Sequence, residues 1–188
     1  LVYCDAGADN DDGSGPDTGF GLDERIVNVA VDGINNPSVD AASVAPAYQD
    51  FTSVVGNMML GVSYPIAIDI NSDGNPGFGY NSDQALVWID LNHDGDFDDF
   101  GELVFTSVIG VGDYTGNITI PGDATLGQTR MRVRLYDTED GTNYPNVSNT
   151  TPCGIGTYGE VEDYTVNIIP FVPDGPGTNC AGFTNNTP

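Results

Sequence analysis

Apolar and polar residues alternate along much of the chain, which is the pattern of β-strands that bury one face. The clearest example is residues 128–136, where one strand face is apolar and the other is basic. The apolar face carries Met131, Val133 and Leu135, and the basic face carries Arg130, Arg132 and Arg134. The same reasoning predicts strands over residues 25–33, 48–55, 58–70, 85–91, 103–108, 114–120 and 161–169.

Three of these segments carry further information. Both faces of residues 85–91 are largely apolar, so we expect a central strand of a two-layer structure. In residues 58–70 the signal breaks near Tyr64 and Pro65, which indicates an edge position or a bulge. Residues 34–47 are rich in Asn, Pro, Ser and Ala and are expected to form a long connection.

The spacing of strands and turns, without a long amphipathic helix, predicts an all-β fold, an antiparallel β-sandwich of jelly-roll-like form. We expect three parts in the chain. Residues 1–24 form an N-terminal arm or loop, residues 25–169 form the sandwich, and residues 170–188 form a Pro/Gly-rich C-terminal tail.

The chain between residues 90 and 102 has the spacing of a calcium loop. Oxygen-bearing side chains recur at alternate positions, and Gly95 allows a sharp turn after the third of them. We expect Ca²⁺ as the cofactor, because it prefers many oxygen ligands on a flexible ring. The first-choice ligands are Asp90, Asn92, Asp94, Asp96 and Glu102, with Glu102 or Asp98 replacing the missing acid at the last position of the pattern.

Two weaker metal candidates are present. The run Asp69, Asn71, Asp73 has the first half of the same pattern, and its alternative interpretation is an ordinary Asn/Gly turn. Glu160 and Glu162 lie on one face of a strand, with Asp163 on the other. They either pair with Arg132 or Arg134 on a neighbouring strand, or ligate a cation together with Asp23, Glu24 or Asp50.

The chain is strongly acidic. It has 28 acidic residues against four basic ones, and a formal net charge of -24. This charge disfavours nucleic acids and anionic membranes as partners, and bound cations would offset part of its self-repulsion. No apolar run is long enough to span a membrane.

The cysteine count and the loops suggest an extracellular setting. Three cysteines allow one disulfide and leave one residue over, and disulfides persist outside the cell. The chain begins at Leu1 without a signal peptide, so we expect a mature or excised chain.

Several segments together resemble the GEVED domain of secreted and cell-surface bacterial proteins. They are TPCGIGTYGEVEDYTVNI, WIDLNHDGDFDDFGELV, ITIPGDATLGQTRMRVRLY, the opening YC and the segment YQDFT. The resemblance covers roughly residues 3–169 and implies a β-sandwich accessory domain without established catalysis. It also implies a disulfide between Cys4 and Cys153, and it does not extend to Cys180 or the tail.

The sequence offers no catalytic constellation. The single histidine, His93, lies inside the acidic loop, and no G-x-S-x-G motif or zinc ligand set is present. We therefore expect a protein that is not an enzyme. N-x-S/T sequons make Asn117, Asn146, Asn149 and Asn185 candidate glycosylation sites.

Two functions remain open at this stage. The first is a calcium-stabilised extracellular structural protein whose terminal arms join copies of it into a surface filament or layer. The second is an adhesin or carbohydrate-binding module of a larger secreted protein. Trp88 lies in a strand expected to be buried, so tyrosines would have to supply a sugar platform; the candidates are Tyr48, Tyr80, Tyr114, Tyr144 and Tyr158.

Overall fold

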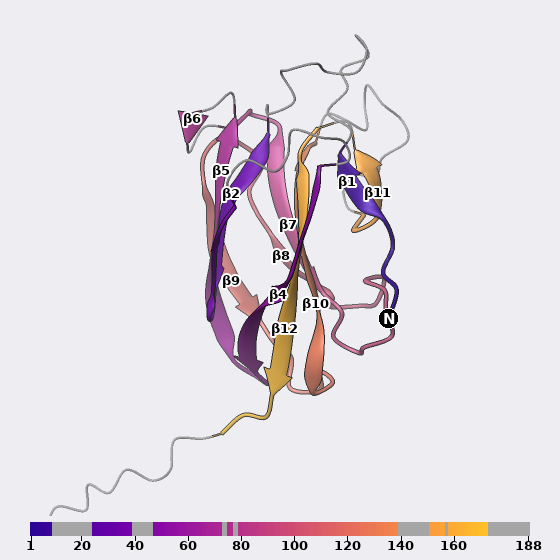
Figure 1. Cartoon of the computed structure of the whole chain (residues 1–188). Coiled ribbons are helices and arrows are strands. Elements are labelled where there is room, and N and C mark those ends of the chain that lie inside the picture. The colour runs from indigo at the N-terminus through magenta and orange to yellow at the C-terminus, as the bar shows by residue number, and fades with distance from the viewer. Residues whose placement is uncertain are drawn as a thin grey trace, which may run out of the picture.

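The computed structural model describes residues 1–8, 24–38, 47–72, 75–76, 79–138, 151–156 and 158–172. Within these ranges the regular elements are strands (Figure 1). They are β1 (Ala6–Ala8), β2 (Arg25–Val31), β3 (Ile34–Pro37), β4 (Tyr48–Met59), β5 (Ser63–Ser72), β6 (Asn75–Pro76), β7 (Asp83–Ile89), β8 (Leu103–Thr106), β9 (Tyr114–Thr119), β10 (Gly127–Asp137), β11 (Gly154–Gly156) and β12 (Glu160–Ile169). The predicted all-β sandwich is confirmed.

Two sheets face each other. One has the order β4-β12-β10-β7-β8, and the other has the order β3-β2-β5-β6 with β9 paired to β5. Most neighbouring strands are antiparallel, but β12 and β4 run parallel. A two-stranded parallel pair, β1 with β11, lies beside the larger sheet (Figure 1).

Most predicted strands are present, and the differences have local causes. The predicted connection 34–47 begins with strand β3, because Asp32 and Gly33 make a two-residue turn that pairs Val31 with Ile34. Gly33 has a φ of 83°, which glycine adopts without strain. An Asp-Gly pair between apolar residues is a hairpin signal, so this strand was open to prediction.

The break in residues 58–70 lies earlier than the sequence indicates. Met59 ends β4, and a turn with Gly61 at a φ of 72° leads into β5 at Ser63. Pro65 therefore lies within β5, which pairs with β9 on one side there. Its missing N–H is tolerated because pairing with β2 begins only at Ile66.

The core lies between the two sheets. It is built from the inward side chains of both sheets, including Val29, Ile68, Val87, Val133 and Val166, each with no exposed surface. The apolar alternation of each strand therefore predicts the core correctly.

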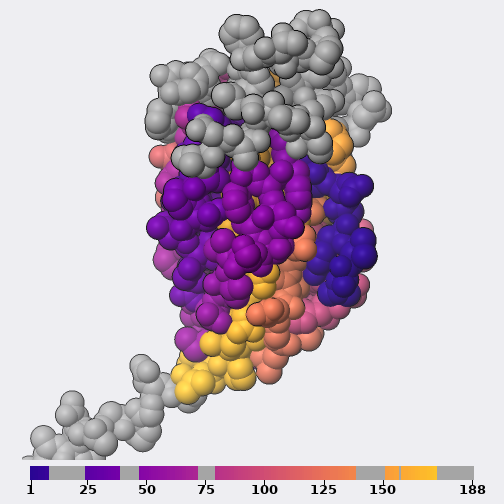
Figure 2. Space-filling model, viewed as in Figure 1, coloured from indigo at the N-terminus to yellow at the C-terminus, as the bar shows by residue number. Residues whose placement is uncertain are grey.

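The N-terminal segment forms a third layer on the outer face of the larger sheet. A smaller apolar cluster lies there, formed by Leu86, Trp88, Phe97 and Tyr136, with Tyr3 packed against it. Figure 2 shows residues 1–8, in indigo, against the side of the sandwich. This covering explains why both faces of β7 are apolar.

The disulfide between Cys4 and Cys153 is present, as the family resemblance implies. It ties the N-terminal segment to the chain beside β11, with a Cα–Cα distance of 5.6 Å and a sequence separation of 149. In the ranges that the structure describes, no helix has the length and apolar character needed to cross a membrane.

Candidate functional site

The acidic loop follows directly on β7 and is organised by Asp90. The side chain of Asp90 is completely buried, and its Oδ1 accepts the backbone N–H of His93 at 2.7 Å. Its Oδ2 accepts the N–H of Gly95 at 3.1 Å and the hydroxyl of Tyr3 at 2.7 Å. Asp90 therefore closes the loop onto itself and joins it to the N-terminal segment.

Glu102 closes the other end of the loop. Its side chain is 1% exposed, and its two oxygens accept the backbone N–H groups of Leu91 at 2.8 Å and Asp99 at 3.3 Å. Burial raises the pKa of Glu102 above its usual range, although these two N–H groups act in the opposite direction. Like Asp90, Glu102 holds the backbone of the loop.

The exposed part of the loop gathers three carboxylates. One oxygen each of Asp94, Asp96 and Asp99 lies within 4.8 Å of the others. The side-chain amide nitrogen of Asn92 lies 2.9 Å from Asp94 and 2.5 Å from Asp99, so an N–H donor stands where a cation would bridge the two. Hydrogen bonding from Asn92 lowers the pKa of Asp94, which keeps that carboxylate ionised.

The loop backbone orients these side chains. Asn92, Asp94 and Asp96 each accept, through a side-chain oxygen, the backbone N–H two residues further on, at 3.0, 3.2 and 3.0 Å. His93 and Gly95 adopt positive φ values of 65° and 99°, so the chain turns tightly here. Oxygen-only ligands on such a turn suit a hard divalent cation such as Ca²⁺.

The structure regroups the predicted first-choice ligands. It brings Asp94 and Asp96 together with Asp99, and it places Asp90 and Glu102 as acceptors for backbone N–H groups. The sequence pattern missed Asp99, because the calcium-loop template is written for a loop between helices. Here the loop leads back into strand β8, so the acids in its second half do not fall at the positions that the template gives them.

The second-choice metal residues are not gathered in the same way. The carboxylate of Asp69 accepts the side-chain amide of Asn28 at 3.1 Å across β5 and β2. Asn71 is 5% exposed and pairs with Arg25 in the strand register. Asp73 and Asp23 lie outside the described residues. Asp50 is exposed and accepts the backbone N–H of Thr52.

The acid of the GEVED motif that pairs with arginine is Asp163. Its Oδ1 accepts Nε of Arg132 at 2.7 Å, and its Oδ2 accepts the second guanidinium nitrogen at 2.8 Å. Oδ2 of Asp163 also accepts hydrogen bonds from the guanidinium of Arg130 at 2.7 Å and from the hydroxyl of Tyr48 at 2.9 Å. Arg132 is 2% exposed and donates further to the carbonyls of Cys4 and Pro152, so it anchors the disulfide-linked segments.

Of the two alternatives for Glu160 and Glu162, the pairing with Arg132 or Arg134 is not the arrangement found. Arg132 is register partner to Asp163 and shares its face, whereas both glutamates point into the sandwich. Glu160 accepts the N–H of Ile26 at 2.7 Å and the side-chain amide of Gln49, which links β12 to β2 and β4.

Glu162 is also completely buried. Its Oε2 accepts the hydroxyl of Tyr164 at 2.6 Å, and that hydroxyl accepts the amide of Asn36 at 3.1 Å. Burial raises the pKa of Glu160 to about 7, and burial together with the neighbouring Glu160 raises that of Glu162 to about 8. Burial and the repulsion between the two carboxylates therefore favour the protonated form of this pair.

The glycine of the motif is required by close packing. Gly159 has a φ of 107°, and a Cβ atom placed there would lie 2.0 Å from the carbonyl oxygen of Leu135 on β10. No other residue fits this approach, which sets the start of β12 against β10.

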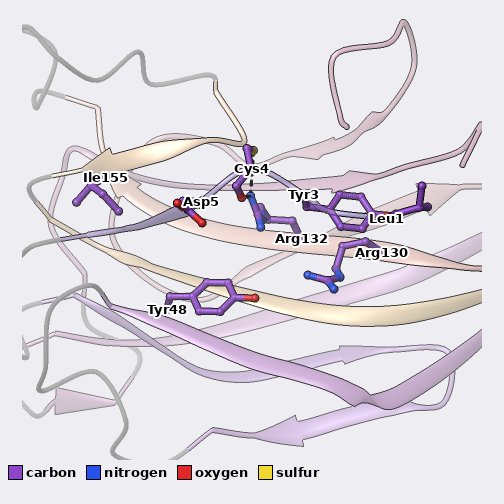
Figure 3. Close-up of a pocket in the computed structure, with 9 residues that line it drawn as sticks. Leu1, Tyr3, Cys4, Asp5, Tyr48, Arg130, Arg132 and Ile155 are labelled. Atoms are coloured by element: carbon purple, nitrogen blue, oxygen red, sulfur yellow. Dashed lines mark hydrogen bonds between the residues drawn. The ribbon is translucent and has the colours of Figure 1, made fainter. Parts of the chain in front are cut away.

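A pocket of about 390 Å³ opens between the N-terminal segment and β4. Figure 3 shows Tyr48 below it, Arg130 and Tyr3 on one side and Asp5 above. The guanidinium of Arg130 lies 4.7 Å from the centre of the Tyr3 ring. Aromatic rings beside an exposed carboxylate and a guanidinium are groups that contact polar, ring-shaped ligands.

The candidate glycosylation sites and the candidate aromatic platform residues lie partly within and partly outside the described residues. Asn117 is exposed on β9, whereas Asn146, Asn149 and Asn185 lie outside the described residues. Trp88 and Tyr114 are 2% and 3% exposed, so neither offers a surface platform. Tyr80 and Tyr158 line a different cavity from Tyr48, and Tyr144 and Cys180 are not among the described residues.

Comparison with known proteins agrees with the motif. Residues 84–167 match the GEVED domain, which supports the family that the sequence resembles. The matched region includes the acidic loop, β10 and the pentapeptide of β12. No curated protein matches the chain.

Solved structures show only distant similarity. One is the CARDB domain of a Pyrococcus furiosus protein in complex with di-metal ions, which is 15% identical in sequence. The match covers 60% of this chain and 79% of that chain, with a TM-score of 0.32. Another is a Niemann-Pick type C2 protein from Japanese carpenter ant, which is 6% identical in sequence. The match covers 80% of this chain and 97% of that chain, with a TM-score of 0.39.

Proposed function

We propose that this chain is a non-enzymatic, extracellular structural domain that calcium stabilises, and that copies of it assemble into a surface filament or layer. The observation that carries the proposal is the position of Asp90. Its carboxylate closes the acidic loop and also receives Tyr3 of the N-terminal segment. Cation binding, the disulfide-linked segment and the sandwich are thereby joined in one rigid unit.

The acidic loop supports calcium as the cation. Asp94, Asp96 and Asp99 present oxygen ligands at the surface, on a chain whose net charge is -24. Three like charges this close repel one another unless a cation compensates them. A divalent ion that replaces the amide nitrogen of Asn92 between them removes that repulsion.

The disulfide supports an extracellular location. Cys4 and Cys153 join segments far apart in the sequence, and such bonds persist in oxidising surroundings. The anchor that Arg132 provides for the same two segments adds to their rigidity.

Assembly through the termini is the part of the proposal that concerns partners. Residues 1–8 are already held on their own domain, so we assign the joining role to the tail, residues 170–188. The acceptor on the next copy is the edge of β4, which ends its sheet and is 12 residues long. An added strand would satisfy the open backbone groups of that edge.

Size-exclusion chromatography with light scattering at millimolar Ca²⁺ tests the assembly, with electron microscopy of the large fractions. We expect concentration-dependent oligomers for the full chain and monomers for a chain that ends at Pro170. Monomers for both chains would contradict self-assembly.

A second candidate function is carbohydrate binding by an adhesin or accessory module. The pocket between Tyr3, Tyr48, Arg130 and Asp5 favours it, because it combines aromatic and hydrogen-bonding groups. A glycan array tests it: binding that Asp5→Asn weakens supports this function. Absence of binding to any glycan, with the fold intact by circular dichroism, would argue against it.

A further inference from the structure

The first part of the C-terminal tail has a proline at every third position. Pro170, Pro173 and Pro176 follow β12, and none of them can donate a backbone N–H to a neighbouring strand. A polyproline II helix has three residues per turn, so this spacing places the three rings on one face of such a helix. Residues 170–176 are therefore suited to a groove that accepts a polyproline segment, and less suited to pairing along the edge of β4.

The start of this segment does not pack on its own domain. Phe171 and Val172 are 57% and 70% exposed, although both side chains are large and apolar. Figure 1 shows the chain after β12 leading away from the sandwich. The whole tail carries one acid, Asp174, in a chain with 28 acidic residues. This weakly charged segment therefore meets little repulsion when it approaches a second acidic copy.

The pocket between the N-terminal segment and β4 has the lining of a polyproline groove. Its volume of about 390 Å³ lies within the range of about 300–1,000 Å³ that ligand pockets span. In Figure 3, Ile155 and Tyr48 lie toward one end of the pocket and Arg130 toward the other. Ile155 is 40% exposed. Grooves that bind proline-rich segments present aromatic and apolar side chains of this kind to the proline rings.

Hydrogen bonds hold both tyrosines of the pocket in place. The hydroxyl of Tyr48 donates to Asp163 at 2.9 Å, and that of Tyr3 donates to Asp90 at 2.7 Å. Neither ring has to be ordered when a ligand binds, so the entropy cost of binding is low on the pocket side. A polyproline segment is stiff before it binds, so the cost is low on the ligand side too.

Arg130 gives the pocket a cationic group that complements Asp174. Its side chain is 23% exposed, and it donates to Asp163 through one nitrogen, Nη1. A guanidinium has five N–H donors, so others are left for the carboxylate of a ligand. Asp174 follows Pro173 directly. The acid of the tail thus lies between two prolines, as the arginine lies beside the apolar end of the pocket.

We propose that residues 170–176 of one copy occupy this pocket on a second copy. The proline rings pack against Tyr48 and Ile155, and the carboxylate of Asp174 binds Arg130. This inference rests on the proposed assembly through the tail, and it specifies where the first part of the tail binds.

The edge of β4 is then left to the rest of the tail, residues 177–188. Tyr48 is the first residue of β4, so the pocket and this edge adjoin on the same copy. Each copy gives its tail to one neighbour and receives the tail of another. Such a head-to-tail contact repeats from copy to copy, and it builds a filament where the rotation does not close a ring.

Titration of the isotope-labelled full chain with a peptide of residues 170–179 tests the pocket directly. The chain is held at a concentration at which light scattering shows monomers, and NMR follows the Ile155 N–H and the Arg130 Nε–H. A second peptide carries Pro173→Ala with Pro176→Ala. The matched control peptide carries Thr178→Ala, which lies outside the proline repeat. All changes are in the peptides, so the fold of the chain is the same in every titration.

We expect saturable shifts at both pocket residues with the native and the Thr178→Ala peptides. Binding of the Pro173→Ala, Pro176→Ala peptide should be about tenfold weaker or worse, because the apolar contacts of two rings are lost. Shifts confined to the amides of β4, equal binding of all peptides, or no binding would overturn the proposal.

The size-exclusion comparison of the full and shortened chains judges the assembly separately. Oligomers of the full chain without peptide shifts at the pocket overturn this inference alone. Shifts at the pocket in a chain that forms no oligomers overturn the assembly alone.

Discussion

The hydroxyl of Tyr3 donates a 2.7 Å hydrogen bond to Oδ2 of Asp90, across a sequence separation of 87 residues. Asp90 is buried, and its other acceptor positions hold the backbone of the acidic loop. The N-terminal segment and the loop therefore share one carboxylate, so a change in either is felt by the other.

Removing this hydroxyl tests the shared carboxylate. Tyr3→Phe keeps the ring, which stacks on Phe97 at 5.1 Å and lies under Arg130. It leaves a buried carboxylate acceptor short of one donor, so we expect a loss of about 1–3 kcal/mol in the free energy of unfolding. Chemical denaturation measures it, and Val2→Ala, at a residue 94% exposed, is the control with no expected change.

Arg132 and Asp163 test the anchor of the N-terminal segment. Arg132→Lys cannot form the two bonds to Asp163 and also reach the carbonyls of Cys4 and Pro152. We expect a loss of about 3–5 kcal/mol, because the buried Asp163 loses its main partner. Arg130→Lys, at a side chain 23% exposed, should cost clearly less, and equal losses would contradict the account.

The glycine of the motif gives the sharpest steric prediction. Gly159→Ala forces a Cβ atom to within 2.0 Å of the Leu135 carbonyl oxygen, at a φ that alanine disfavours. We expect a chain that fails to fold, seen as loss of the thermal transition and of the dispersed amide NMR spectrum. Gly122→Ala has open space around it and should fold normally.

The buried glutamates predict how stability depends on pH. Their pKa values rise from 4.5 to about 7 for Glu160 and about 8 for Glu162, mainly through burial. Between pH 4.5 and 8 the native state therefore holds more protons than the unfolded state. The contribution of these two groups to stability is complete below pH 4.5 and is lost as pH rises through 7 and 8, with a slope of at most about 1.4 kcal/mol per pH unit for each group.

Thermal unfolding from pH 5 to pH 9 measures this slope. Glu162→Gln keeps the size of the side chain and removes its titration, so we expect a flatter pH profile than that of the wild type. A variant whose profile has the same slope as the wild type would show that Glu162 is ionised throughout.

Much of the fold could be predicted from the alternation of side chains. The two faces of β10 and β12 could be assigned from the sequence because successive residues of a strand lie on opposite faces. Met131 and Arg132 are such a pair on β10, and Glu162 and Asp163 are such a pair on β12. The short strands β1, β6 and β11 could not be read in this way. Ala6–Ala8 and Gly154–Gly156 have no alternation, and they pair because a disulfide and Arg132 hold their neighbours together.

The candidate site was predictable in place but not in detail. Alternate oxygens and Gly95 identified the loop, yet its spacing could not show that Asp90 and Glu102 turn inward toward backbone N–H groups. That depends on Tyr3 and on the backbone of residues 91–99, which fold back over the sheet.

The most direct test of the account is the melting temperature of the wild-type chain in EDTA and in increasing Ca²⁺, beside Asp94→Asn and the control Asp123→Asn. Binding to the native state alone stabilises it by about 2.7 kcal/mol at a hundred times the dissociation constant. We predict a melting temperature that rises with Ca²⁺ in the wild type and the control, and a reduced rise in Asp94→Asn. An equal melting temperature in EDTA and in millimolar Ca²⁺ for the wild type would contradict a calcium-stabilised domain.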